Sequence, residues 1–144
     1  MRRGRGYVIV DGVAGHTAED GVLANLRFTL QLLAASAQDQ ISHVLPPLHG
    51  DIAGEMAENF DNWALSVHTY WTLTDEQTQA LNGLSAFFDA QDSAGHPTFW
   101  EDEALASDER WEQVRHLARA ALAAFGWPVA VPPRQQYRWL EESI

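Results

Sequence analysis

Hydrophobic residues recur at steps of three and four along much of the chain, which is the spacing of an amphipathic helix. The longest such stripe runs from Leu48 to Trp71 and includes Met56, Phe60 and Val67. Three shorter stripes have the same period. Together they predict helices over residues 18–37, 51–71, 75–91 and 107–125.

Residues at the helix boundaries support this interpretation. Thr74 is followed three residues later by Gln77, the spacing of a capping box that opens a helix. Gly126 and Pro128 come just after the last stripe, where glycine and proline end helices. We therefore expect a mainly α fold in which about four helices pack as a bundle.

Both ends of the chain lack the helical period. Tyr7–Val10 is a short, β-branched run, and Val129–Pro133 is rich in valine and proline. The sequence therefore predicts one helical domain, residues 1–144, with an extended N-terminal segment (1–16) and an extended C-terminal tail (128–144). The apolar run at 7–10 is too short for a secretory leader, and no run spans a bilayer, so we expect a cytoplasmic protein with no membrane contact.

The composition of the chain excludes several classes of function. Apolar residues make up 46% of the 144 residues, which suits one compact core. The formal charge is −11, from 9 basic and 20 acidic residues, whereas binding to nucleic-acid phosphates requires clustered basic residues, so we expect no direct contact with nucleic acid. There is no cysteine, so disulfides, thiolate zinc sites and cysteine nucleophiles are excluded.

The negative charge is concentrated in the middle of the chain. Residues 51–112 contain fourteen carboxylates and one arginine, Arg110, a net charge of −13. Such a segment attracts cationic partners and speeds their encounter. The alternative is a solvated acidic surface that only provides solubility.

One part of the acidic segment combines carboxylates with aromatic residues. Phe99 and Trp100 directly precede Glu101, Asp102 and Glu103. Aromatic residues are enriched at the centres of protein interfaces. We therefore expect a surface that binds and neutralises a basic protein, as immunity proteins and phage-encoded inhibitors do. Its predicted residues are Phe99, Trp100, Glu101, Asp102, Glu103, Asp108 and Glu109. The alternative for the aromatic pair is a loop anchor that covers the end of the bundle.

A second hypothesis is a metal-dependent enzyme. Glu55 and Glu58 are three residues apart on one predicted helix, and Asp89 and Asp92 are three apart on the next. This pattern loosely resembles the all-α nucleotide pyrophosphohydrolases, which bind magnesium and a nucleoside triphosphate through an ExxE pair and an ExxD pair. The resemblance covers these four residues and departs in its second pair, which is Asp-Asp here. It implies a Mg²⁺-dependent nucleotide hydrolase.

Other chemistry has no motif in this sequence. The six histidines are scattered, and no HExxH pair, nucleophile elbow or P-loop occurs. We therefore expect a binding protein without a cofactor rather than an enzyme. A third hypothesis, a structural or assembly subunit, predicts a homo-oligomer formed through the helix faces.

Overall fold

Six α-helices and two short strands make up most of the part that the computed structural model describes, residues 7–9, 18–43, 50–95, 97–133 and 137–139. In chain order the elements are β1 (Tyr7–Ile9), α1 (Ala18–Leu33), α2 (Ala37–His43), α3 (Ile52–Tyr70), α4 (Asp75–Ser93), the 3-10 helix η2 (Pro97–Trp100), α5 (Ala104–Ser107), α6 (Glu109–Phe125) and β2 (Tyr137–Trp139). The prediction of a mainly helical fold is confirmed.

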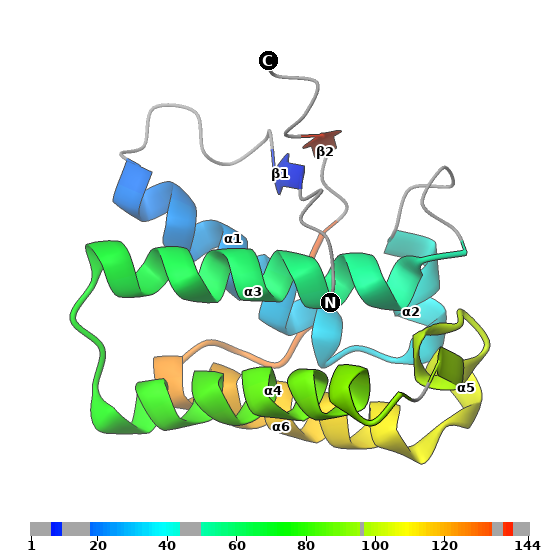
Figure 1. The fold of residues 1–144 in the computed structure, drawn as a ribbon. Coiled ribbons are helices and arrows are strands. Elements are labelled where there is room, and N and C mark those ends of the chain that lie inside the picture. The colour runs from blue at the N-terminus through cyan, green and yellow to red at the C-terminus, as the bar shows by residue number, and fades with distance from the viewer. Residues whose placement is uncertain (1–6, 10–17, 44–49, 96, 134–136, 140–144) are drawn as a thin grey trace.

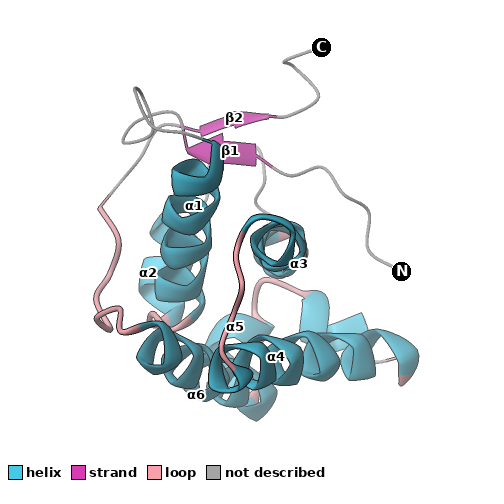
Figure 2. Cartoon of the chain, turned by 90° about the vertical axis from the view of Figure 1, so that its left-hand side faces the viewer, coloured by secondary structure: helices cyan, strands magenta, loops and turns pink. Residues whose placement is uncertain are grey.

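The four long helices form two layers. Figures 1 and 2 show α1 beside α3 in one layer, and α4 beside α6 in the other. Helix α4 runs back beneath α3 after the short turn at residues 71–74, and α6 runs antiparallel to α4 (Figure 1). The two strands pair antiparallel, with Tyr7 opposite Trp139. Most of the predicted extended segments, residues 1–16 and 128–144, lie outside the described residues.

The predicted helices match the long ones to within a few residues, with one exception. The helix expected over 18–37 ends at Leu33, and a separate helix, α2, begins at Ala37. The Ser36 hydroxyl accepts a hydrogen bond from the Asp39 backbone N–H at 3.2 Å, which caps this new helix. The short elements α2, η2 and α5 were not predicted, because each is too brief to show a hydrophobic period.

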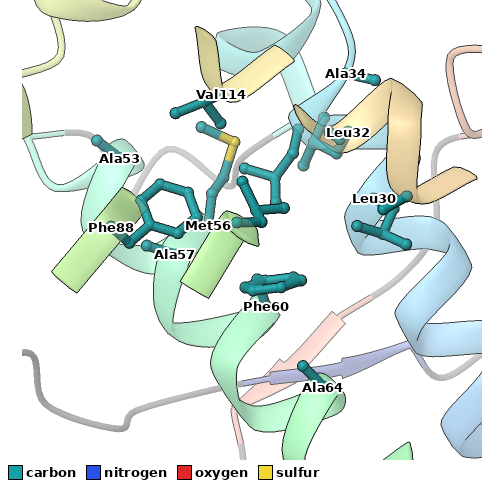
Figure 3. Packing of buried hydrophobic residues seen from close by; sticks show 14 of the residues in the cluster. Leu30, Leu32, Ala34, Ala53, Met56, Ala57, Phe60, Ala64, Phe88 and Val114 are labelled. Carbon is teal, nitrogen blue, oxygen red and sulfur yellow. The ribbon is translucent and has the colours of Figure 1, made fainter. Parts of the chain in front are cut away.

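The core fills the space between the two layers. Met56 and Phe60 of α3 lie among the buried side chains of this core, together with Phe88 of α4 (Figure 3). The Phe88 ring centroid lies 6.2 Å from that of Phe60 and 6.0 Å from that of Trp111, and all three rings are fully buried. The contact joins α3, α4 and α6, so the aromatic residues hold the layers together.

A buried arginine closes the C-terminal end of α1. Arg115 of α6 is only 4% exposed, and its Nε donates to the Ala35 carbonyl at 2.9 Å. Its Nη2 donates to the Leu105 carbonyl at 2.5 Å and to Gln40 Oε1 at 2.9 Å. The Gln40 amide nitrogen in turn donates to two carbonyls in the last turn of α1. Side chains from other helices thus satisfy carbonyls that the end of a helix leaves without partners.

Within the described residues, none of the helices has both the length and the apolar character that crossing a bilayer requires.

Candidate functional site

The predicted aromatic pair anchors η2 to the core. Phe99 is fully buried and stacks on Trp111, with ring centroids 4.8 Å apart and an interplanar angle of 7°. Trp111 Nε1 donates to the Phe99 carbonyl at 2.9 Å. Trp100 meets Phe99 edge-on and is half-buried. The Phe99 ring is therefore not available to a partner, whereas Trp100 keeps part of its surface in solvent.

The Asp102 side chain binds the backbone at the start of α3. Its carboxylate accepts hydrogen bonds from the backbone N–H of Gly50 at 2.6 Å and of Ile52 at 3.1 Å. These groups lie at the start of α3, where the N-cap residue Asp51 supplies no side-chain cap. A carboxylate at a helix N-terminus satisfies main-chain donors and interacts favourably with the helix dipole. Asp102 therefore fixes the loop before α5 against α3.

Asp108 and Arg110 form an ion pair with several hydrogen bonds at the start of α6. Asp108 is the N-cap, and its Oδ1 accepts from the Arg110 backbone N–H at 2.9 Å. The same carboxylate binds the Arg110 guanidinium through Nε at 2.9 Å and Nη2 at 2.5 Å. The hydrogen bonds that the guanidinium donates to the Asp108 carboxylate raise the pKa of Arg110. The guanidinium also lies 5.3 Å from the Phe99 ring centroid, so this arginine is held on the protein.

The remaining acidic residues surround an open hollow of about 540 Å³. Glu101, Glu103 and Glu109 are exposed there, and none forms an ion pair with another described residue. The hollow is lined by Thr98, Glu101, Glu103, Ala104, Ser107, Asp108, Glu109 and Arg110. Four of the seven predicted partner-binding residues thus meet at one place: Glu101, Glu103, Asp108 and Glu109. Three residues do not line it: Phe99, Trp100 and Asp102.

Sequence reasoning missed three polar residues that line the hollow: Thr98, Ser107 and Arg110. Arg110 had a signal, since it is the only basic residue among residues 51–112. A lone arginine two positions after an N-cap aspartate is well placed to bind that carboxylate. Thr98 and Ser107 carried no signal, because their positions depend on how η2 and α5 fold.

The carboxylates of the enzyme hypothesis lie on two different helices. Glu55 is buried and Glu58 half-buried on α3, while Asp89 is exposed and Asp92 half-buried on α4. Among the residues that the structure describes, no three histidine, aspartate or glutamate side chains are grouped to hold a metal ion. The structure therefore does not assemble these four carboxylates into one metal site.

No protein-family model, curated protein or solved structure matches this chain. The geometry of the hollow and the charge around it are therefore the features that bear on function.

Proposed function

We propose that the protein binds a basic protein partner through the acidic hollow and blocks the partner's cationic surface. The observation that carries the proposal is the group of exposed carboxylates, Glu101, Glu103 and Glu109, around a hollow of about 540 Å³. Carboxylates form strong, charge-assisted hydrogen bonds with guanidinium and ammonium groups. The three carboxylates are exposed, so such groups of a partner can reach them.

The charges of the site divide into two kinds. Asp102 and Asp108 are engaged in fixing the loop and the start of α6, so their main contribution is to hold the site in shape. The three exposed glutamates are available for a partner. Because the loop is already fixed before binding, less conformational entropy is lost when the partner docks.

Long-range charge supports the same function. The protein carries a formal charge of −11, and this field accelerates the approach of a cationic protein. Charges at the rim of an interface mainly affect the association rate and its dependence on salt. We therefore expect association that slows steeply as ionic strength rises. A small acidic protein that covers a basic active surface would act as an immunity-like or inhibitor-like factor.

Trp100 supplies an apolar contact beside the acidic hollow. It is half-buried and packs edge-on against Phe99, which fixes its ring. Rigid aromatic residues are frequent among the residues that dominate binding energy. In this proposal, the partner's cationic side chains bind the glutamates and an apolar side chain packs on the exposed part of Trp100.

The first experiment identifies the partner. Immobilised protein is incubated with a lysate of the source organism, eluted with a salt gradient, and the eluate is identified by mass spectrometry. We expect one basic protein to be retained stoichiometrically and released as salt rises. If no basic protein is retained, the proposal fails.

The second experiment locates the surface. Glu101→Lys/Glu103→Lys reverses two charges in the hollow, and Glu76→Lys/Asp89→Lys reverses two exposed charges on α4. Exposed ion pairs contribute about 0.2–1 kcal/mol each, and reversal also adds repulsion, so the hollow variant should bind roughly tenfold more weakly. The α4 variant has the same net charge and should bind nearly as tightly as the unmodified protein. Equal weakening of both variants would show that only net charge matters.

A further inference from the structure

The segment after α6 is attached to the helices at two of its main-chain carbonyls. Gln31 Nε2 of α1 donates to the Pro128 carbonyl at 3.1 Å. Nε2 of the His43 ring, at the end of α2, lies 2.7 Å from the Pro132 carbonyl. Pro132 is buried, whereas the three residues between the two attachment points are exposed. Figure 2 shows this stretch as the loop beside α1 and α2, so the two side chains hold the loop against these helices.

The second ring nitrogen of His43 also faces a carbonyl oxygen. Nδ1 lies 2.9 Å from the Asp39 carbonyl, one turn earlier in α2. A carbonyl oxygen only accepts hydrogen bonds, and a neutral imidazole has one N–H and one bare, accepting nitrogen. In either neutral tautomer, one ring nitrogen would therefore set its lone pair against a carbonyl lone pair at hydrogen-bond distance. Only the imidazolium, which has an N–H on both nitrogens, donates to both oxygens.

We propose that His43 is a pH-dependent clasp, which holds the Pro132 end of this segment while its ring is protonated and releases it when the ring becomes neutral. A neutral ring with its proton on Nδ1 repels the Pro132 carbonyl. A neutral ring with its proton on Nε2 is repelled by the Asp39 carbonyl, which α2 fixes in place, so the ring turns away. Both tautomers weaken the contact with Pro132. The clasp is therefore complete at low pH and is lost as the pH rises through the range in which histidine titrates.

The described elements around the ring bring few other ionisable groups. Asp39 is the carboxylate on α2 itself, and α6 contributes Arg115 and Arg119, which bind carbonyls at the end of α1. The last turn of α1, helix α5 and the described segment after α6 contain no ionisable side chain. Outside the described residues, His49 and Arg134 are the next ionisable residues along the chain. Carboxylic acids ordinarily titrate below about pH 5 and arginine stays charged, so of the described groups only the imidazole is of a type that changes charge near neutral pH.

The other attachment point does not depend on pH, because the Gln31 amide that forms it is neutral. One end of the segment therefore stays attached while the other loosens. We expect Val131 to gain mobility at high pH, and Trp127, whose N–H donates to the Leu122 carbonyl at 2.9 Å, to stay fixed. Hydrogen bonds from a charged donor are roughly twice as strong as neutral ones, so the ratio of attached to detached forms at the Pro132 end should fall about tenfold.

NMR spectra of the ¹⁵N-labelled protein at about pH 5.5 and about pH 8 test the clasp. Long-range ¹H–¹⁵N spectra show whether each ring nitrogen of His43 carries a proton, and the ¹H–¹⁵N NOE of each backbone amide reports its fast mobility. At the lower pH we expect protons on both ring nitrogens and a rigid Val131 amide. At the higher pH we expect one bare nitrogen and a mobile Val131, with Trp127 rigid at both. A bare ring nitrogen while Val131 is rigid, or a Val131 mobility that does not change with pH, would overturn the proposal.

Two substitutions assign the response to this histidine. His43→Gln has a side chain that does not titrate, so the mobility of Val131 should be the same at both pH values. His116→Gln, at an exposed position on α6, is the matched control and should keep the full response. A pH response that persists in His43→Gln, or disappears in His116→Gln, would refute the assignment. The hydrogen bonds of the clasp involve no residue that lines the acidic hollow, so the result is independent of the proposed function.

Discussion

Replacing Arg115 with alanine should destabilise the protein far more than any other substitution of a charged residue on α6. The side chain is 4% exposed and donates to the carbonyls of Ala35 and Leu105 and to the amide oxygen of Gln40. In Arg115→Ala these three acceptors lose their donor inside the protein. Its ion pair with Glu112 matters less, because the Glu112 side chain is 69% exposed and such pairs contribute at most about 1 kcal/mol.

The magnitude follows from the three acceptors. A buried polar group left without a partner costs about 1–3 kcal/mol, which gives an upper limit of about 9 kcal/mol. Water that enters the vacated space restores part of this, and removing a partner from a buried charged network typically costs about 3–5 kcal/mol. We expect a loss of about 4 kcal/mol from a total stability on the order of 5–15 kcal/mol.

Urea denaturation followed by circular dichroism measures the loss. With a slope of about 2 kcal/mol per molar urea, Arg115→Ala should shift the midpoint down by about 2 M. Arg119→Ala is the matched control, because Arg119 lies one turn further along α6, is exposed, and has one long hydrogen bond, 3.4 Å to the Ala34 carbonyl. The control should change the free energy of unfolding by less than about 1 kcal/mol.

A third variant separates hydrogen bonding from packing. Arg115→Met keeps an apolar chain of similar length and has no donors, so it should lose most of the stability that Arg115→Ala loses. If the methionine variant were as stable as the unmodified protein, the assigned role of the hydrogen bonds would be wrong. A midpoint for Arg115→Ala close to that of Arg119→Ala would refute the whole argument.

Four further substitutions test other features. Trp111→Phe removes the hydrogen bond to the Phe99 carbonyl and part of a fully buried ring, so thermal unfolding should show a loss of about 2–4 kcal/mol and the near-ultraviolet dichroism should weaken. Asp102→Ala removes the cap at the start of α3 and should cost about 1 kcal/mol by urea denaturation; no change would show that water replaces the cap. Gly126→Ala places a side chain at φ 72° and should destabilise by about 1 kcal/mol, whereas Gly83→Ala, in an open position on α4, should stabilise by about 0.5–1 kcal/mol.

The long helices could be predicted because their signals are local. The stripe from Leu48 to Trp71 and the capping box at Thr74 each depend on residues close in sequence, and α3 and α4 appear where these signals place them. The end of α1 was misplaced, although Ser36 followed three residues later by Asp39 was a usable cap signal. The apolar stripe continues past Leu33 to Ala37, so the hydrophobic period alone extends the predicted helix beyond its true end.

The site could be predicted only in part, because its roles depend on contacts far apart in sequence. The acidic composition near residue 101 was evident, and the hollow does gather Glu101, Glu103 and Glu109. The sequence did not reveal that Asp102 binds the start of α3, 50 residues earlier. It also did not separate the buried Phe99 from the exposed glutamates, because a loop has no period from which burial can be deduced.

The hydrogen bond between Arg115 and Ala35 can form only after most of the chain has been synthesised. The two residues are 80 positions apart, so the C-terminal end of α1 leaves the ribosome long before the side chain that satisfies it. At about 5–20 residues per second, the interval is roughly 4–16 s. During that time the carbonyls at Leu32 and Leu33 have partners nearby in sequence, the Gln40 side chain for both and the Ala35 backbone N–H for Leu32, whereas the Ala35 carbonyl still lacks its arginine. Helix α6 thus completes the end of α1, and a nascent chain that stops before α6 emerges with the end of α1 unfinished.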